Sequence, residues 1–167
     1  MLEPPVGFKR VGRVTELTIV TQIKEGFVPG EYRTYRQRLE QGLGGMQQRI
    51  EDGIPTPPSL IPTIHFARWF LLSRQLIQTL TGAEASRDLL VFTSNFDGDP
   101  KQYLRDFSLE IPEDIDRVWE NCEGYPEAGC ADFEAFWRYA RDHQVETLAF
   151  AASYPWVTTK DVQLRFA

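Results

Sequence analysis

Four polar side chains stand inside two stretches of sequence that otherwise have the apolar character of buried strands. They are His65, Arg68, Asn95 and Asp97. Burying such groups costs about 1–3 kcal/mol each unless they are hydrogen-bonded or serve a site. An imidazole with a pKa near its ordinary value of about 6.5 can transfer a proton at neutral pH, and a carboxylate can accept one. We therefore predict His65 and Asp97 as the catalytic candidates.

A structural role is the alternative for both residues. His65 would then be bonded to a backbone group or a carboxylate. Asp97 precedes Gly98, and Asp-Gly is a common turn pair. The second histidine, His143, lies in the last turn of the predicted helix that starts near Asp132, where the helix dipole favours a positive charge and predicts a capping role.

The sequence predicts no metal or cofactor site. Cys122 and Cys130 are eight positions apart and lack the Cys-x-x-Cys spacing of zinc and redox sites. Two scattered histidines do not complete a zinc ligand set, and no glycine-rich phosphate loop or Gly-x-Ser-x-Gly motif is present. We expect a protein that needs no cofactor, with two free thiols.

Composition narrows the classes of partner. The formal charge of −6 and the isoelectric point of about 5.0 argue against nucleic acid and anionic membranes, which require clustered cationic groups. No apolar run reaches the roughly 18 residues of a membrane span, and the first residues lack the pattern of a signal peptide. We expect a cytoplasmic protein, and 167 residues with 42% hydrophobic side chains predict one domain over residues 1–167.

The elements that must position these residues follow from periodicity and turn signals. Alternation predicts strands over residues 14–23, 60–72, 89–96 and 148–154. Helical spacing predicts a helix over residues 31–51, and further helices starting near Pro100, Pro112, Asp132 and Thr158 or Thr159. Residues 73–88 are predicted as a short helix or a long hairpin tip. The order predicts an α+β, ferredoxin-like β-α-β-β-α-β fold with an antiparallel four-stranded sheet.

Such a fold covers one face of its sheet with helices and leaves the other face open. Because side chains alternate between the two faces of a strand, we expect Glu16, Asn95 and Asp97 on the open face. His65 and Trp69 would join them if the apolar stripe containing Phe66 is buried under the helices. Arg68 would then point toward the helices and reach an acid such as Asp106 or Glu110. His65 and Arg68 point opposite ways unless a bulge intervenes.

Residues 14–154 resemble the dimeric α/β-barrel superfamily, whose paired ferredoxin-like sheets enclose small-molecule pockets. The resemblance is carried by the first strand and its Pro-Gly turn, residues 15–30. It implies a homodimer, and the superfamily includes cofactor-free monooxygenases, small-ring isomerases and haem enzymes. Residues 94–98, Ser-Asn-Phe-Asp-Gly, are also similar to the Gly-x-x-Asp-Gly motif of dye-decolourising peroxidases, although Ser94 replaces the first glycine and the chain holds one ferredoxin-like unit where those enzymes usually have two.

The sequence therefore predicts a homodimer that binds a small apolar or aromatic molecule in a cavity on the sheet face. It would act as a cofactor-free oxygenase or isomerase, or as a binding protein. The predicted ligand-binding residues are Glu16, Arg68, Trp69 and Asn95, beside the catalytic candidates His65 and Asp97. A structural subunit without catalysis is the alternative, and a haem-dependent peroxidase-like protein ranks below it.

Overall fold

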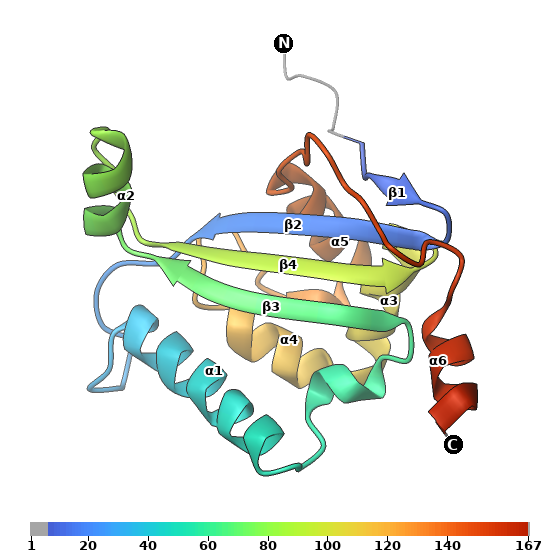
Figure 1. The fold of residues 1–167 in the computed structure, drawn as a ribbon. Coiled ribbons are helices and arrows are strands. Elements are labelled where there is room, and N and C mark those ends of the chain that lie inside the picture. Colours follow the sequence, from blue (N-terminus) through green and yellow to red (C-terminus); the bar gives the residue numbers. More distant parts are fainter. Residues whose placement is uncertain (1–6, 167) are drawn as a thin grey trace.

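A computed structural model describes residues 7–166 and shows an α+β fold built on one antiparallel sheet (Figure 1). The sheet holds β1 (Arg10–Val11), β2 (Val14–Gln22), β3 (Ile64–Leu72) and β4 (Leu89–Asp97). Their order across the sheet is β1-β2-β4-β3. The predicted α+β class with an antiparallel four-stranded sheet is therefore confirmed.

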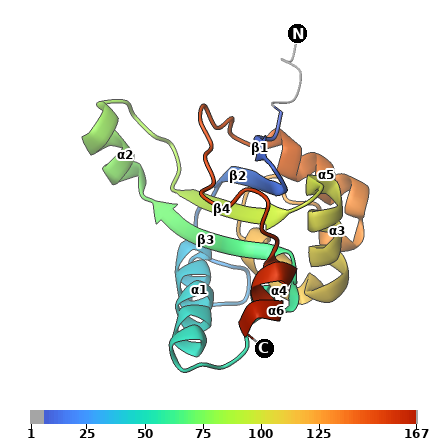
Figure 2. The ribbon, with the colours of Figure 1, turned by 45° about the vertical axis from the view of Figure 1, so that its right-hand side comes forward.

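Six α-helices lie within the described residues. They are α1 (Tyr35–Glu51), α2 (Arg74–Thr81), α3 (Pro100–Glu110), α4 (Pro112–Trp119), α5 (Phe133–Asp142) and α6 (Thr159–Phe166). Figures 1 and 2 show α1, α3, α4 and α5 on one side of the sheet. The chain that leads to α6 crosses the other side, the open face. The predicted helix starts at Pro100, Pro112 and Thr159 agree with these bounds.

The core lies between the helices and the closed face of the sheet. Phe92 and Phe96 of β4 are completely buried there. The Phe96 ring stacks on Tyr103 of α3, with ring centroids 3.7 Å apart. The Tyr103 hydroxyl lies 2.6 Å from Ser94 Oγ, so the one polar atom of this ring has a partner inside the core. This packing fixes β4, the central strand beside the predicted site.

The turn that follows β4 forms as its residues predict. The Asp99 side chain accepts a hydrogen bond from the backbone N–H of Gln102 at 2.9 Å, and Pro100 occupies the first turn of α3. Such a cap satisfies one of the N–H groups that a helix start leaves without a partner. Asp99 is therefore the capping residue that the sequence predicted.

The start of one predicted strand shifts. The strand predicted over residues 60–72 begins at Ile64, because Pro57–Leu60 form a turn of 3-10 helix and Pro62 has no backbone N–H to donate. The segment of residues 73–88 contains α2, whose first turn is capped by Ser73. The prediction of a short helix there is confirmed.

The strand predicted over residues 148–154 is wrong, since this segment pairs with no strand in the described structure. The chain meets the edge of β2 earlier, where Gln144 bridges to Ile19 and the Val145 N–H donates to the Thr18 carbonyl at 2.9 Å. Beyond Thr18 the same edge is already used, because the Glu16 N–H donates to the Lys9 carbonyl and β1 follows. Residues 146–166 leave the sheet edge instead, and we call them the C-terminal arm.

The arm is anchored where it passes the turn between β1 and β2. The Arg13 N–H donates to the Pro155 carbonyl at 2.7 Å. Gly12 sits at this contact with a φ of +62°, and a Cβ placed on it would lie 2.2 Å from the Pro155 carbonyl oxygen. A residue with a side chain would be strained by its φ and would also collide with the backbone of the arm. Glycine is therefore required here for the arm to dock.

We expect Gly12→Ala to destabilise the protein by about 2 kcal/mol and to lower its Tm by about 4–8 °C. Gly44→Ala is the matched control, because Gly44 lies in the exposed middle of α1 with nothing within 4 Å of its missing Cβ. That change should stabilise the protein by about 0.5–1 kcal/mol. Thermal unfolding of both variants is the measurement, and a Gly12→Ala protein as stable as the parent would contradict the anchor.

Candidate functional site

A β-bulge in β3 decides which side chains face the open side. Ile64 pairs with Phe96 and Phe66 pairs with Asn95, so His65 is an extra residue without its own partner in β4. Residues directly opposite each other in an antiparallel pair share a face. Phe66, Arg68 and Phe70 therefore lie on the open face, opposite Asn95, Thr93 and Val91.

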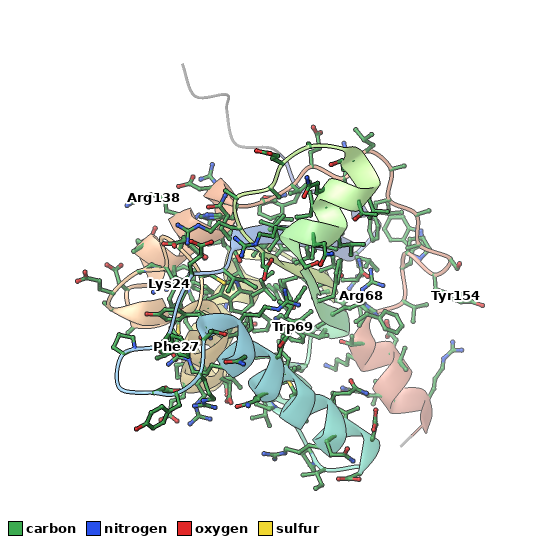
Figure 3. All side chains as sticks on the ribbon, turned by 90° about the vertical axis from the view of Figure 1, so that its left-hand side faces the viewer. Lys24, Phe27, Arg68, Trp69, Arg138 and Tyr154 are labelled. Atoms are coloured by element: carbon green, nitrogen blue, oxygen red, sulfur yellow. The ribbon has the colours of Figure 1, made fainter. Side chains whose placement is uncertain are left out.

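The predicted faces of Trp69 and Arg68 are wrong, and the bulge is the reason. Trp69 points toward the helices and packs on the buried ring of Phe92, with ring centroids 4.9 Å apart. Arg68 lies on the open face over the Phe70 ring, 5.4 Å from its centroid, rather than beside Asp106. Figure 3 shows Arg68 on the side of the arm and Trp69 on the side of α1. Trp69 is thus a partly buried residue packed against the core, and Arg68 is available to a ligand on the open face.

A hollow of about 730 Å³ lies between the open face and the C-terminal arm. From the sheet it is lined by Val14, His65, Phe66 and Asn95, and from the arm by residues that include Phe150 and Val157. A second hollow of about 390 Å³ is lined by Phe66, Ala67, Arg68, Thr93 and Asn95. The two hollows share Phe66 and Asn95, so they adjoin along β3 and β4.

The structure brings the two catalytic candidates together. His65 Nε2 and Asp97 Oδ1 are 2.8 Å apart, and their side chains are 18% and 14% exposed. If Nε2 carries the proton, it donates a hydrogen bond to Asp97. The other ring nitrogen, Nδ1, then carries the free lone pair. Nδ1 has no hydrogen bond within residues 7–166, so it is the atom of this pair that a ligand can engage.

Asp97 has structural contacts as well. Its Oδ2 accepts hydrogen bonds from the Thr159 N–H at 2.8 Å and from the Thr159 hydroxyl at 3.0 Å. The hydroxyl also lies 2.6 Å from the Pro62 carbonyl, and its single proton can favour only one of these acceptors. Thr159 is the first residue of α6, so Asp97 caps that helix from a distant part of the chain. This role does not test catalysis by Asp97, which stays a prediction.

Glu16 and Asn95 lie opposite each other on the open face, as predicted. Glu16 is only 4% exposed, and its carboxylate has long contacts of 3.4 Å with the Lys9 N–H and the Thr18 hydroxyl. The Asn95 side chain has no hydrogen-bond partner among residues 7–166, although it lines both hollows. Its amide group is therefore free to donate to, or accept from, a ligand.

The arm residues that line the hollow were missed by the sequence reasoning. The segment from Leu148 to Tyr154 has enough apolar side chains to resemble a strand, and this pattern hid its role as a wall. Tyr154 is 77% exposed on the arm, away from the core (Figure 3). The useful signal was the Pro155 that ends the segment, because a proline is unfavourable inside a paired strand.

The described residues offer little to a metal or a covalent intermediate. They include no group of three or more His, Cys, Asp or Glu side chains placed to hold a metal ion. Cys122 and Cys130 are free and buried, and burial raises the pKa of Cys122 to about 11 and that of Cys130 to about 12. Both stay thiols at neutral pH and are poor nucleophiles. None of the helices in residues 7–166 has the length and apolar character needed to cross a membrane.

Comparison with known proteins assigns the chain to no family. No protein-family model, curated protein or solved structure matches it. The geometry of the open face is therefore the guide to function.

We expect Thr159→Val to weaken the attachment of α6 to the sheet while leaving the sheet folded. The change removes the hydroxyl but keeps the side-chain volume, and the loss of about 1 kcal/mol should raise amide exchange in α6 about fivefold. Thr79→Val is the control, because among residues 7–166 its hydroxyl bonds only to the Gln75 carbonyl of its own exposed helix. Hydrogen–deuterium exchange measures the effect, and unchanged exchange in α6 would show that Asp97 and Pro62 do not hold the arm through this hydroxyl.

Proposed function

We propose that this protein binds a small apolar or aromatic molecule in the hollow beneath the C-terminal arm. The observation that carries the proposal is the volume and lining of this hollow. Ligand sites usually enclose about 300–1,000 Å³ with mostly apolar walls and a few polar groups. At about 730 Å³, with Val14, Phe66, Phe150 and Val157 among its walls, the hollow falls within that range.

Two polar groups would orient the molecule. Asn95 offers an amide without a partner among the described residues, and His65 offers Nδ1 when its Nε2 donates to Asp97. The same arrangement supports a cofactor-free oxygenase or isomerase as an extension of the proposal. In that case His65 would accept a proton from the bound molecule, and Asp97 would stabilise the resulting imidazolium. A peroxidase-like role for Asp97 gains no support, because its carboxylate is already bound by His65 and Thr159.

The test uses an uncharged fluorescent probe, N-phenyl-1-naphthylamine, whose emission rises in an apolar site. We expect saturable binding by the parent protein and at least a tenfold loss of affinity in Ala151→Trp, because Ala151 lines the hollow and a large ring there would fill it. Ala151 is exposed, so the core is not disturbed.

The matched control is Ala149→Trp, which places the same ring on an exposed arm residue outside the hollow. It should bind the probe like the parent. Equal affinities in all three proteins would show that the probe binds elsewhere, and absence of saturable binding would contradict the proposal.

Assembly of two copies through the open face is the second candidate, and the exposed aromatic rings on β3 favour it. Phe66 is 76% exposed and Phe70 is 37% exposed, although both lie on a sheet strand. Apolar side chains gathered on one face of a folded chain commonly mark an interface. Such a homodimer would pair its open faces as a dimeric α/β barrel does, with Phe66 and Phe70 in the interface.

We expect the parent protein to sediment as a dimer at micromolar concentration and Phe70→Glu to sediment as a monomer, because the carboxylate would have to be buried in the interface. Leu109→Glu is the control, since Leu109 is 69% exposed on α3 and the helices separate it from the open face. A parent protein that sediments as a single 19.2 kDa species would exclude this assembly.

A further inference from the structure

One cation occupies the middle of the open face without an acidic partner. Arg68 is exposed on β3, and within residues 7–166 its guanidinium makes no ion pair and no hydrogen bond. The guanidinium lies over the face of the Phe70 ring. Seven other arginines reach carboxylates, as expected in a chain with a net charge of −6: Arg33, Arg36, Arg38, Arg74, Arg87, Arg105 and Arg117. Arg68 is one of the arginines that do not, and it lines a hollow beside Thr93 and Asn95.

We propose that the ligand of the open face is an apolar or aromatic carboxylate, with Arg68 as the group that recognises its charge. This inference rests on the proposed function and names the ligand class for the same surface. The guanidinium carries parallel N–H donors that match the two oxygens of a carboxylate. The second hollow places Arg68 beside Thr93 and Asn95, which add a hydroxyl and an amide to the same place.

The linings of the two hollows give the ligand a direction. Arg165 of α6 also lines the hollow under the arm, but most of the walls there are apolar, among them Val14, Phe150 and Val162. The smaller hollow places a cation, a hydroxyl and an amide together, so it suits the charged end of a ligand better. Arg68 lies in the next open-face row of the sheet, opposite Thr93. The carboxylate therefore binds at Arg68, and the apolar part extends over Phe66 into the hollow under the arm.

The shared lining residues make this orientation continuous. Phe66 and Asn95 belong to both hollows, so a molecule can occupy the two together. A flexible chain of a few carbons between ring and carboxylate suits this arrangement, because the ring and the charge are then recognised by different rows of the sheet.

The experiment compares 4-phenylbutyrate with 4-phenylbutyramide, which has the same shape and no charge, by isothermal titration at pH 7 and low salt. We expect the acid to bind about tenfold more tightly than the amide, and added salt to reduce this difference. Arg68→Gln should abolish the preference while leaving the affinity for the amide within about twofold. Arg68→Lys keeps the charge and should retain part of the preference.

Arg138→Gln is the matched control, because Arg138 is an exposed arginine on α5, on the helix side of the molecule (Figure 3). It should bind both compounds like the parent. Equal affinities for acid and amide in the parent, or a preference that survives Arg68→Gln, overturn the proposal but leave the proposed function standing. If neither compound binds and N-phenyl-1-naphthylamine still does, the ligand class is wrong. If that probe also fails, the proposed function is wrong as well.

Discussion

The carboxylate of Asp97 joins three parts of the chain that are distant in sequence, and the candidate site depends on this junction. One oxygen meets the imidazole of His65 in the bulge of β3, and the other accepts from Thr159 at the start of α6. A helix start leaves N–H groups without partners and is favoured by a nearby negative charge. Asp97 supplies both an acceptor and that charge, and so holds the arm across the sheet. Without the arm, the hollow would have no second wall.

A second constraint is the single extra residue in β3. Because side chains alternate along a strand, one inserted residue transfers every later side chain to the opposite face. This is why Trp69 enters the core and Arg68 reaches the open face, whereas strict alternation from Ile64 gives the reverse. The core also favours this outcome, because the Trp69 ring finds Phe92 beneath it.

The parts of the fold that local chemistry controls were predictable from the sequence. Asp99 and Pro100 marked the start of α3, and the alternation in β2 and β4 placed Glu16 and Asn95 on the open face correctly. The bulge was not predictable, because no glycine or proline at His65 marks it. Nor was the course of the arm, since Leu148–Tyr154 has the composition of a strand although Lys9 and β1 already occupy the edge of β2 beyond Thr18.

The two features that sequence periodicity could not predict are the two that build the site. A regular β3 would direct His65 and Arg68 to opposite faces, and a regular fourth strand would leave the open face flat and without a hollow. The bulge places His65, Phe66 and Arg68 along one surface, and the arm encloses one end of it. Gly12 belongs to the same set, because its missing side chain admits the Pro155 carbonyl. Departures from regular pairing often accompany binding sites, because regular strands and helices already satisfy their own backbone groups and present few concave surfaces. In this protein Asn95 pairs with Phe66 directly beside the bulge, and Arg68 reaches the open face because the bulge reverses the faces of the residues that follow it. The chemistry of both side chains therefore depends on this one irregularity of the backbone.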